Sequence, residues 1–386
     1  MHLFNFNWTT EQPTRRRIDR KSSSRTPTAI AANRGLCGED EFLRFLYLER
    51  RRSERSSRPL CLVLLDGAEI LEIDTRETAF KQVYETLRAS IRETDAIGWY
   101  QESCALGILF SDLNCADKPV VNTLREKVSN AVNGRLPPIL ASRIPISVHV
   151  FPSSNNLNTK PADLTLYPDL PHQARARRTS HVLKRVIDVA GSLCLLCLLG
   201  PLLVVVALAI KLTSQGPALF RQSRIGQYAK PFSFLKFRSM CVNNDVAIHK
   251  DYVTKLISLG QVASETKPVF KITNDPRVTP VGRFLRKTSI DELPQLWNVL
   301  CGQMSLVGPR PPLPYELDCY ALWHRRRVLE VKPGITGLWQ VTGRSRTTFN
   351  EMVRLDLRYA KQWSLWLDIK ILLQTPKAVL MGEGAY

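Results

Sequence analysis

The sequence predicts an α/β N-terminal domain followed by a mainly α-helical, membrane-associated domain that contains a re-entrant helix. Between residues 36 and 151, short buried strand patterns alternate with amphipathic helix patterns. One long apolar segment, "KRVIDVAGSLCLLCLLGPLLVVVALAIKLTSQGP", follows at 184–217. A mixed segment dense in Arg, Pro and Gly comes after it. The 386 residues leave room for two or three domains, each able to bury its own core.

The N-terminal half predicts a disordered leader, one domain and a linker. Residues 1–35 are rich in Arg, Ser and Thr without apolar periodicity, so a disordered, basic N-terminus is expected. Residues 36–151 are expected to form the α/β domain, with strands at 60–66, 104–110 and 144–151 and helices at 77–95 and 118–132. Residues 152–180 carry Pro, Asn and a closing basic cluster, which predicts a linker.

The apolar segment predicts a bent membrane helix over residues 186–213, inside a domain that spans 181–386. Residues 189–210 carry no charge, and a straight helix of that length would extend ~33 Å, enough to cross a bilayer. Gly200 and Pro201 lie in its middle. Proline removes a backbone hydrogen bond and clashes with the preceding turn, so a bend is expected there.

Basic residues flank both ends of this helix, with Lys184 and Arg185 on one side and Lys211, Arg221 and Arg224 on the other. The positive-inside rule then favours both ends in the cytosol. A re-entrant helix that enters and leaves by the same face satisfies this rule. A straight span and a soluble core helix are the alternatives.

Asp188 is the one acid near the start of the apolar segment. It lies four residues after Lys184 and three after Arg185, so on a helix it is expected to pair with one of them. We expect a structural role for it rather than a catalytic one.

The C-terminal part contains two further amphipathic segments, at 253–263 and 364–382. Trp363, Trp366 and Lys370 lie in or beside the second of them, among apolar residues. Each segment fits a helix lying flat at a membrane interface or an ordinary core helix, and the sequence leaves both readings open.

The charge and cysteine content limit the classes of binding partner and indicate the cellular compartment. The formal net charge of +19 points to an anionic partner, which means nucleic acid, a nucleotide substrate or the negative cytoplasmic leaflet. The basic runs lack a recognition helix or an aromatic stacking platform, so no nucleic-acid partner is expected. Nine cysteines without metal-ligand spacing disfavour a disulfide framework and a zinc site and fit a reducing compartment. The N-terminus lacks the apolar core of a signal peptide, so the first domain should stay in the cytosol.

Two adjacent carboxylates, Asp291 and Glu292, lie in "RKTSIDELPQLWNVL" at 286–300. Ser289 and Glu292 have the spacing of a capping box, and Pro294 is tolerated only near a helix start, so a helix is expected to begin close to Asp291. Neighbouring residues on a helix point ~100° apart, so the two acids are expected to differ in role. A capping role and a chemical role are compatible.

Basic residues are dense around this acid pair in the sequence. A nucleotide substrate, one of the anionic partners that the net charge allows, would carry concentrated negative charge, which calls for guanidinium groups, helix N-termini and a divalent cation. The candidate phosphate-binding residues are Lys236, Arg238, Arg277, Arg283, Arg286, Arg310 and Arg344. Arg310 lies in "GPRPP" at 308–312, which predicts a stiff turn.

The blocks "KFRSM", "DELPQLWNVLCGQMSLVGPRP" and "KPGITGLWQVTGR", in this order after a proline-broken apolar helix, resemble one family. They are similar to the bacterial sugar transferases, the monotopic phosphoglycosyl transferases, which join a sugar phosphate from a nucleotide diphosphate sugar to a polyprenyl phosphate. The resemblance runs from about Lys184 to the C-terminus.

This resemblance implies a chemistry for the acid pair. Asp291 would be the nucleophile that attacks the sugar-bearing phosphorus of a UDP-sugar and releases UMP, and undecaprenyl phosphate would then attack the aspartyl intermediate. Glu292 would bind the metal or act as a base, with Mg²⁺ held at the acid pair. The protein would lie in the bacterial cytoplasmic membrane with its soluble parts in the cytoplasm, and it would initiate exopolysaccharide, O-antigen or other glycoconjugate assembly. A non-catalytic, membrane-tethered signalling or scaffold protein is the alternative.

The first domain resembles a GGDEF domain over "IRETDAIGWYQESCALGILF" at 91–110. Where that family carries its Gly-Gly-Asp-Glu-Phe motif, this chain has Gln101, Glu102, Ser103, Cys104 and Ala105. The paired glycines and the acidic pair are absent, so cyclase activity is not expected. A degenerate domain for regulation or dimerisation fits better, which makes a homodimer a candidate assembly. An unrelated α/β domain is the alternative.

Overall fold

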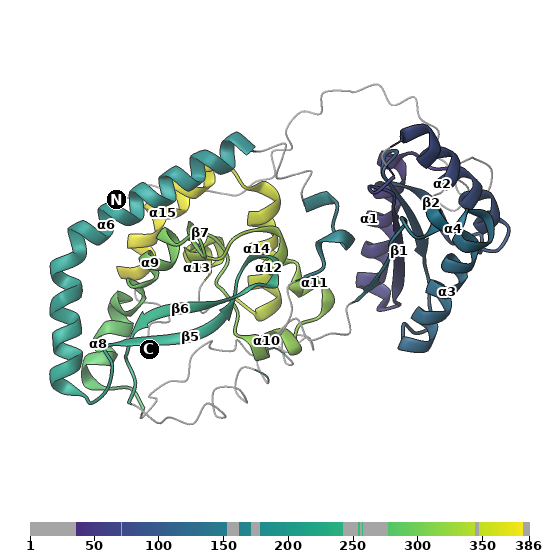
Figure 1. The fold of residues 1–386 in the computed structure, drawn as a ribbon. Coiled ribbons are helices and arrows are strands. Elements are labelled where there is room, and N and C mark those ends of the chain that lie inside the picture. Colours follow the sequence, from purple (N-terminus) through teal and green to yellow (C-terminus); the bar gives the residue numbers. More distant parts are fainter. Residues whose placement is uncertain are drawn as a thin grey trace, which may run out of the picture.

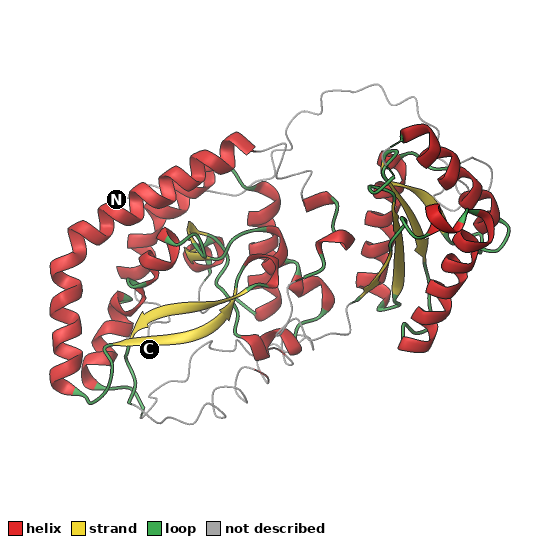
Figure 2. Cartoon of the chain, in the orientation of Figure 1, coloured by secondary structure: helices red, strands yellow, loops and turns green. Residues whose placement is uncertain are grey.

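A computed structural model describes residues 36–70, 72–152, 162–170, 178–241, 254, 257, 277–343 and 347–380. They form an α/β domain and a larger, mainly helical domain along one long bent helix (Figure 1, Figure 2). The predicted disordered leader 1–35, most of the predicted helix 253–263, and Arg344 lie outside the described residues.

The α/β domain is a four-stranded antiparallel sheet with strand order β2-β3-β1-β4. Its elements are α1 Glu39–Ser56, β1 Leu60–Asp66, α2 Ile73–Arg88, β2 Ala96–Gln101, β3 Ala105–Phe110, α3 Lys118–Arg135, α4 Pro138–Ala141 and β4 Ile146–Phe151. The three predicted strands and two predicted helices are confirmed, with shifts at their ends. Helix α1 was not among the predicted elements. The residues that replace the Gly-Gly-Asp-Glu-Phe motif lie at the turn between β2 and β3.

The central strand β1 is apolar because both of its faces are covered. Val63 and Leu65 point into a core with α2 and α3, and Leu62 and Leu64 point into a second core with α1. Side chains alternate between the two faces of a strand, so a strand buried on both sides reads as a continuous apolar run.

Residues 162–170, inside the predicted linker, form a clasp between the two domains. Tyr167 packs against the α1 side of the first domain and also against the core of the second. Arg50 of α1 donates to the carbonyl of Leu166 at 2.9 Å and pairs with Asp169 at 3.0 Å. On the other side, the Ala162 N–H donates to the carbonyl of Tyr228 at 3.0 Å. This part of the linker therefore packs as a structural element of its own.

The second domain consists of short elements packed against the long helix α6. Two small sheets, β5-β6 antiparallel and β7-β8 parallel, lie among the helices. The elements are α6 Arg178–Thr213, β5 Leu219–Ile225, β6 Pro231–Phe237, α8 Pro280–Thr288, α9 Gln295–Leu300, β7 Ser305–Val307, α10 Pro314–Asp318, α11 Leu322–Arg325, α12 Arg327–Glu330, β8 Gly334–Thr336, α13 Leu338–Thr342, α14 Phe349–Gln362 and α15 Leu365–Leu380.

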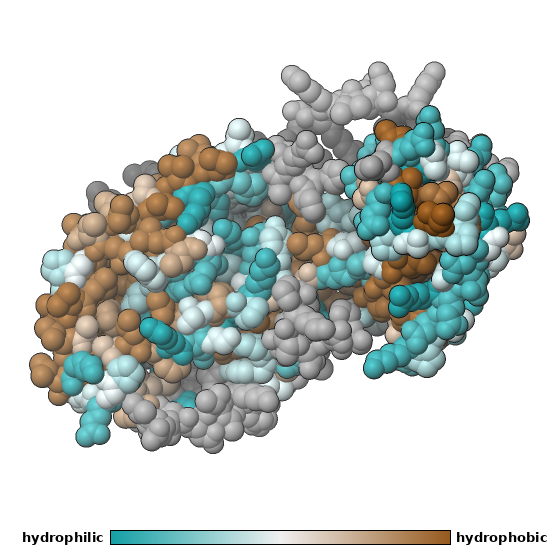
Figure 3. Space-filling model, viewed as in Figure 1, coloured by the Kyte–Doolittle hydropathy of each residue, from teal (hydrophilic) through white to brown (hydrophobic). Residues whose placement is uncertain are grey.

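Helix α6 runs without interruption through Pro201 and changes direction along its course (Figure 1), so the predicted bend is observed. Among the described residues it is the one helix long and apolar enough to cross a membrane. Figure 3 shows hydrophobic side chains gathered along it. Its exposed large apolar residues are Val182, Leu183, Val186, Leu193, Leu195, Leu198, Leu202, Val204, Val205, Leu208 and Leu212.

The predicted amphipathic segment 364–382 is helix α15. It has features of an interfacial helix and of a core helix. Trp366 and Leu373 are exposed, as a helix at an interface requires. Ile371 is buried in the core, and so is Trp363, which comes just before the helix. One face of α15 therefore packs inside the domain while the other face is apolar and open.

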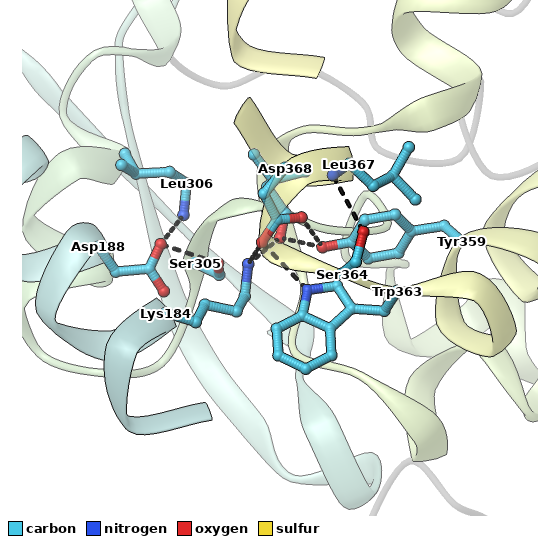
Figure 4. A network of polar contacts seen from close by, with 10 residues as sticks. Lys184, Asp188, Ser305, Leu306, Tyr359, Trp363, Ser364, Leu367 and Asp368 are labelled. Carbon is cyan, nitrogen blue, oxygen red and sulfur yellow. Dashed lines mark hydrogen bonds and ion pairs between the residues drawn. The ribbon is translucent and has the colours of Figure 1, made fainter. Parts of the chain in front are cut away.

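The first arm of α6 is anchored by polar contacts that differ from the predicted ones. Asp188 does not pair with Lys184 or Arg185. Its Oδ1 accepts hydrogen bonds from the Leu306 N–H at 2.9 Å and the Ser305 hydroxyl at 3.0 Å (Figure 4). Asp188 turns to these groups because the Leu306 N–H of β7 would otherwise be buried without a hydrogen-bond partner.

The two basic residues find other partners. Lys184 lies 2.6 Å from the carboxylate of Asp368 on α15 and donates to the carbonyl of Val307 (Figure 4). Arg185 donates to the carbonyls of Val299 and Leu300 at the end of α9, at 2.6 and 2.7 Å. A cation at a helix C-terminus meets carbonyls that have no intrahelical partner. The predicted structural role of these residues is therefore seen, with different partners.

Candidate active site

The acid pair lies on a short turn between two helices. Helix α8 ends at Thr288, Ser289 adopts a left-handed conformation (φ 58°), and residues 290–292 form a 3₁₀ turn that leads into α9. The predicted helix start near Asp291 is confirmed. The predicted capping box is wrong, because Ser289 makes no side-chain cap and only its backbone carbonyl bonds the Glu292 N–H. In a turn with three residues per repeat, adjacent carboxylates point ~120° apart.

Asn298 on α9 joins the acid-bearing segment to strand β6. Its Nδ2 donates to the carbonyl of Ser233 at 2.7 Å, and its Oδ1 accepts from the Leu235 N–H at 3.0 Å. These two bonds reproduce the pairing that a neighbouring strand would offer. They hold β6, in which Lys236 is the next residue, against α9 and the turn that carries Asp291.

Lys236 is a half-buried cation within electrostatic range of both acids. Burial lowers the pKa of its ammonium to about 8, and the charges of Arg224 and Arg310 lower it further. Asp291 and Glu292 oppose this effect and raise the pKa. Lys236 therefore lies within electrostatic range of both acids and of the predicted cation Arg310.

Arg224 is a site residue that sequence reasoning missed. It was counted as a basic flank of the apolar helix, but its side chain is only 4% exposed. Burial lowers the pKa of its guanidinium to about 10, with a further decrease from Arg310 and opposing effects from Glu316 and Glu292. Strand alternation could have found it, because Arg224 shares a face of β5 with Phe220, whose ring lies 5.1 Å from the Lys236 Nζ.

The loop that carries Arg310 is held at every residue from 308 to 312, as the predicted stiff turn requires. The Gly308 N–H donates to the carbonyl of Thr336 at 2.8 Å. The next four carbonyls, those of residues 309–312, accept in turn from the Gly334 N–H, Arg327 Nη2, Arg224 Nη1 and the Ile225 N–H.

Glycine is required where this loop meets strand β8. A Cβ on Gly308 would lie 2.3 Å from the carbonyl oxygen of Lys332, and a Cβ on Gly334 would lie 2.0 Å from the nitrogen of Gly308. The blocks "GPRPP" and "PGITG" therefore approach each other through their backbones.

The remaining predicted cations lie in several environments. Arg238 is buried at the end of α6, where its Nη2 donates to the carbonyl and the hydroxyl of Ser214. Arg283 is exposed on α8, and Arg286 is half-buried on the same helix. The carbonyl of Arg277 accepts from the Cys241 N–H. Contact of these four side chains with the acid pair stays a prediction.

The donor set fits Mg²⁺ better than a metal that takes all its ligands from the protein. Among the described residues, no group of three His, Cys, Asp or Glu side chains is placed to hold a metal. Asp291 and Glu292 offer two hard carboxylate donors on one turn. Mg²⁺ is commonly held by one or two carboxylates, with water and substrate phosphates completing the shell.

Residues 179–382 match the model of the bacterial sugar transferase family, and the chain belongs to this family of transferases. An undecaprenyl-phosphate galactose phosphotransferase of Salmonella typhimurium is 45% identical over 213 residues, which are 55% of this chain and 43% of that protein. A UDP-glucose:undecaprenyl-phosphate glucose-1-phosphate transferase of Klebsiella pneumoniae is 42% identical over 212 residues (53% and 42%). The chain spans less than half the length of these two relatives. The exopolysaccharide production protein ExoY of Rhizobium meliloti is 37% identical over 206 residues (53% and 88%).

Solved structures similar to the chain include GGDEF-type proteins. A DGC protein from Thermotoga maritima is 17% identical with a TM-score of 0.25, covering 31% of this chain and 84% of that one. The GGDEF domain of DgcB from Caulobacter crescentus is 15% identical with a TM-score of 0.24, covering 36% and 80%.

Proposed function

We propose that the protein transfers a sugar-1-phosphate from a UDP-sugar to undecaprenyl phosphate through a covalent intermediate on Asp291. The observation that carries this proposal is that strand β6, which bears Lys236, packs against the turn that bears Asp291 and Glu292, and that both acids, Arg224 and Arg310 act electrostatically on Lys236. A carboxylate among fixed cations can approach a diphosphate that free carboxylates would repel. Family membership and the printed activities of the relatives support the same reaction.

The reaction balances in two displacements. An oxygen of the Asp291 carboxylate bonds to the sugar-bearing phosphorus, and the bond from this phosphorus to the bridging oxygen breaks, so that UMP leaves with the electron pair. A phosphate oxygen of undecaprenyl phosphate then bonds to the same phosphorus and frees the Asp291 carboxylate. The product is a sugar on undecaprenyl diphosphate.

The other residues of the pocket stabilise charge. Lys236, Arg224 and Arg310 offset the negative charge of the donor diphosphate and of the leaving UMP. Glu292 holds the metal or accepts a proton. Mg²⁺, when bound by Asp291 and Glu292, supplies further neutralisation of the phosphate oxygens. The sugar itself is not assigned.

We also propose that α6 is re-entrant, with both ends on the cytoplasmic side. Its first arm is bonded to β7 through Asp188, and its second arm packs through Ile210 against Phe237 and Leu285. Both arms thus contact one domain, which cannot lie on both sides of a bilayer. Basic flanks favour the cytoplasmic side. There the site meets a water-soluble donor and the headgroup of a lipid acceptor.

The covalent step is tested by mass spectrometry and UMP release. Wild type incubated with a UDP-sugar and Mg²⁺, without acceptor, should gain one sugar phosphate on the peptide that contains Asp291. Asp291→Asn should gain none and should release no UMP when acceptor is added. Asp318→Asn, an exposed acid on α10, is the matched control and should behave as wild type. Equal UMP release from Asp291→Asn and wild type would refute the nucleophile.

The topology is tested by labelling cysteines on the two flanks of α6. In a variant whose native cysteines are replaced by serine, Arg178→Cys and Thr213→Cys are treated with an impermeant thiol reagent. Both positions should be protected in intact spheroplasts and labelled in inverted vesicles. Labelling of one flank from each side would establish a straight span instead.

A further inference from the structure

We infer that Arg327 is a positioning residue for Arg310, and that it acts by holding the backbone of the 308–312 loop. Arg327 is the first residue of helix α12, and it is only 3% exposed. It lies outside the blocks that suggested phosphate-binding residues. The inference rests on the proposed function, because it concerns how one cation of that site is aimed.

Three groups converge on the Arg327 guanidinium. Its Nη2 donates to the carbonyl of Arg310 at 2.9 Å and lies 2.7 Å from the carboxylate of Asp356 on α14. Its Nη1 donates to the hydroxyl of Tyr320 at 3.1 Å. The planar fork of arginine serves these partners at once, whereas the single ammonium of lysine cannot reproduce this geometry. Asp356 balances the charge, so Arg327 is held in place without the substrate.

The aim of Arg310 depends on its backbone. The Arg310 guanidinium is exposed, and it makes no hydrogen bond with a described residue. The next carbonyl of the loop, that of Pro311, accepts from the buried Arg224 Nη1 at 2.6 Å, so the loop places Arg310 close to Arg224. Among the described residues, the contacts that hold Arg310 are those of the loop main chain. Within that loop, the carbonyl of residue 310 is held by Arg327.

Arg327 makes its contacts away from the acid pair. Among the described residues, its hydrogen-bond and ion-pair partners are Tyr320, Asp356 and the carbonyl of Arg310. Its charge is balanced within the helical core of the domain. Loss of its hydrogen bond should therefore affect catalysis only through Arg310.

A double-mutant cycle separates this role from a general effect on folding. Arg327→Lys, Arg310→Gln and the double variant are compared with wild type for UMP release and, separately, for equilibrium binding of UDP by calorimetry. Each single variant should lose about tenfold or more in turnover with the donor, the scale expected for a misplaced group. The double variant should be no worse than Arg310→Gln alone. Arg326→Lys, next to Arg327 and paired with Glu330, is the matched control and should match wild type.

Several outcomes overturn the inference. Losses that multiply in the double variant would show that Arg327 acts independently of Arg310, and wild-type activity of Arg327→Lys would remove its role altogether. If Arg327→Lys does not fold, Tyr320→Phe takes its place in the cycle, because this change removes one acceptor of the Arg327 guanidinium. The double variant with Arg310→Gln should again be no worse than Arg310→Gln alone. If wild type releases no UMP, the proposed function is refuted but the inference about Arg327 is not. The same four proteins compared for UDP binding then decide the role of Arg327. Absence of UDP binding by wild type would overturn both.

Discussion

The ammonium of Lys184 lies 2.6 Å from the carboxylate of Asp368, which ties the start of α6 to the last helix, α15 (Figure 4). The same carboxylate accepts from the hydroxyl of Tyr359 at 2.7 Å and from the indole N–H of Trp363 at 3.1 Å. Lys184 and Asp368, which are 184 residues apart in the sequence, therefore meet at one ion pair. The long helix is held to the domain by a polar network as well as by apolar packing.

Replacement of this acid should destabilise the domain. In Asp368→Asn, the ammonium of Lys184 stays in a mostly buried place without its counter-ion, which typically costs about 3–5 kcal/mol. Thermal unfolding of the detergent-solubilised protein measures the loss. The double variant Lys184→Met/Asp368→Asn buries no unpaired charge and should lose less than the sum of the single variants. An unchanged unfolding midpoint in Asp368→Asn would show that the pair contributes nothing.

Arg224 should be required for activity although it lies next to the membrane helix in sequence. Arg224→Lys removes the guanidinium that donates to the carbonyl of Pro311 at 2.6 Å and stacks 4.6 Å from the ring of Phe234. We expect kcat/KM for UMP release to fall about tenfold or more, since lysine lacks the planar fork. Arg221→Lys, exposed on the same strand, is the matched control. Equal losses of kcat/KM in the two variants would show that Arg224 acts only as a basic residue flanking the membrane helix.

The clasp should hold the two domains together through Arg50. This side chain is only 1% exposed and lies 4.2 Å from the ring of Tyr167, in addition to its contacts with Leu166 and Asp169. Arg50→Met leaves Asp169 without its cation and should weaken docking by about 3 kcal/mol. Trypsin should then separate the domains faster than in wild type. Arg55→Met, exposed at the end of the same helix, should leave the rate unchanged.

Acid should destabilise the domain through His324. This buried ring accepts from the Ala321 N–H at Nδ1 and contacts Asn350 Oδ1 at Nε2, and burial lowers its pKa to about 4 from the usual 6.5. Protonation at Nδ1 would place a ring N–H opposite the Ala321 N–H, so that two donors would face each other without an acceptor. Because the unfolded chain binds the proton more tightly, this stability is complete above about pH 6.5 and is lost as the pH falls toward 4.

The variant His324→Gln isolates this effect. A shift of this size corresponds to a loss on the order of 3 kcal/mol, since one pKa unit is about 1.4 kcal/mol. Unfolding midpoints are compared between pH 7.5 and 4.5. The wild-type curve should fall more steeply than that of His324→Gln, which has no ring to protonate. Parallel curves would mean that His324 does not couple folding to pH.

Local patterns predicted what depends on neighbours in sequence. The strand at residues 60–66 and a bend in the long apolar helix follow from apolar runs and from the missing proline N–H, and both are observed. The helix start near Asp291 was found for the same kind of reason. The partner of Asp188 was wrong because helix spacing offered Lys184 and Arg185, whereas the fold offered the buried N–H of Leu306, 118 residues away.

The sequence by itself determined the order of elements, the apolar helix and the acid pair with its surplus of cations. Each of these features depends on the types of residues that are close to one another in the sequence. Only the tertiary structure decided which cations reach the acids and what holds them there. Arg224 and Arg327 owe their roles to carbonyls of a loop formed from distant parts of the chain. A guanidinium is placed by the groups that it meets after folding, and these groups cannot be read from its neighbours in sequence.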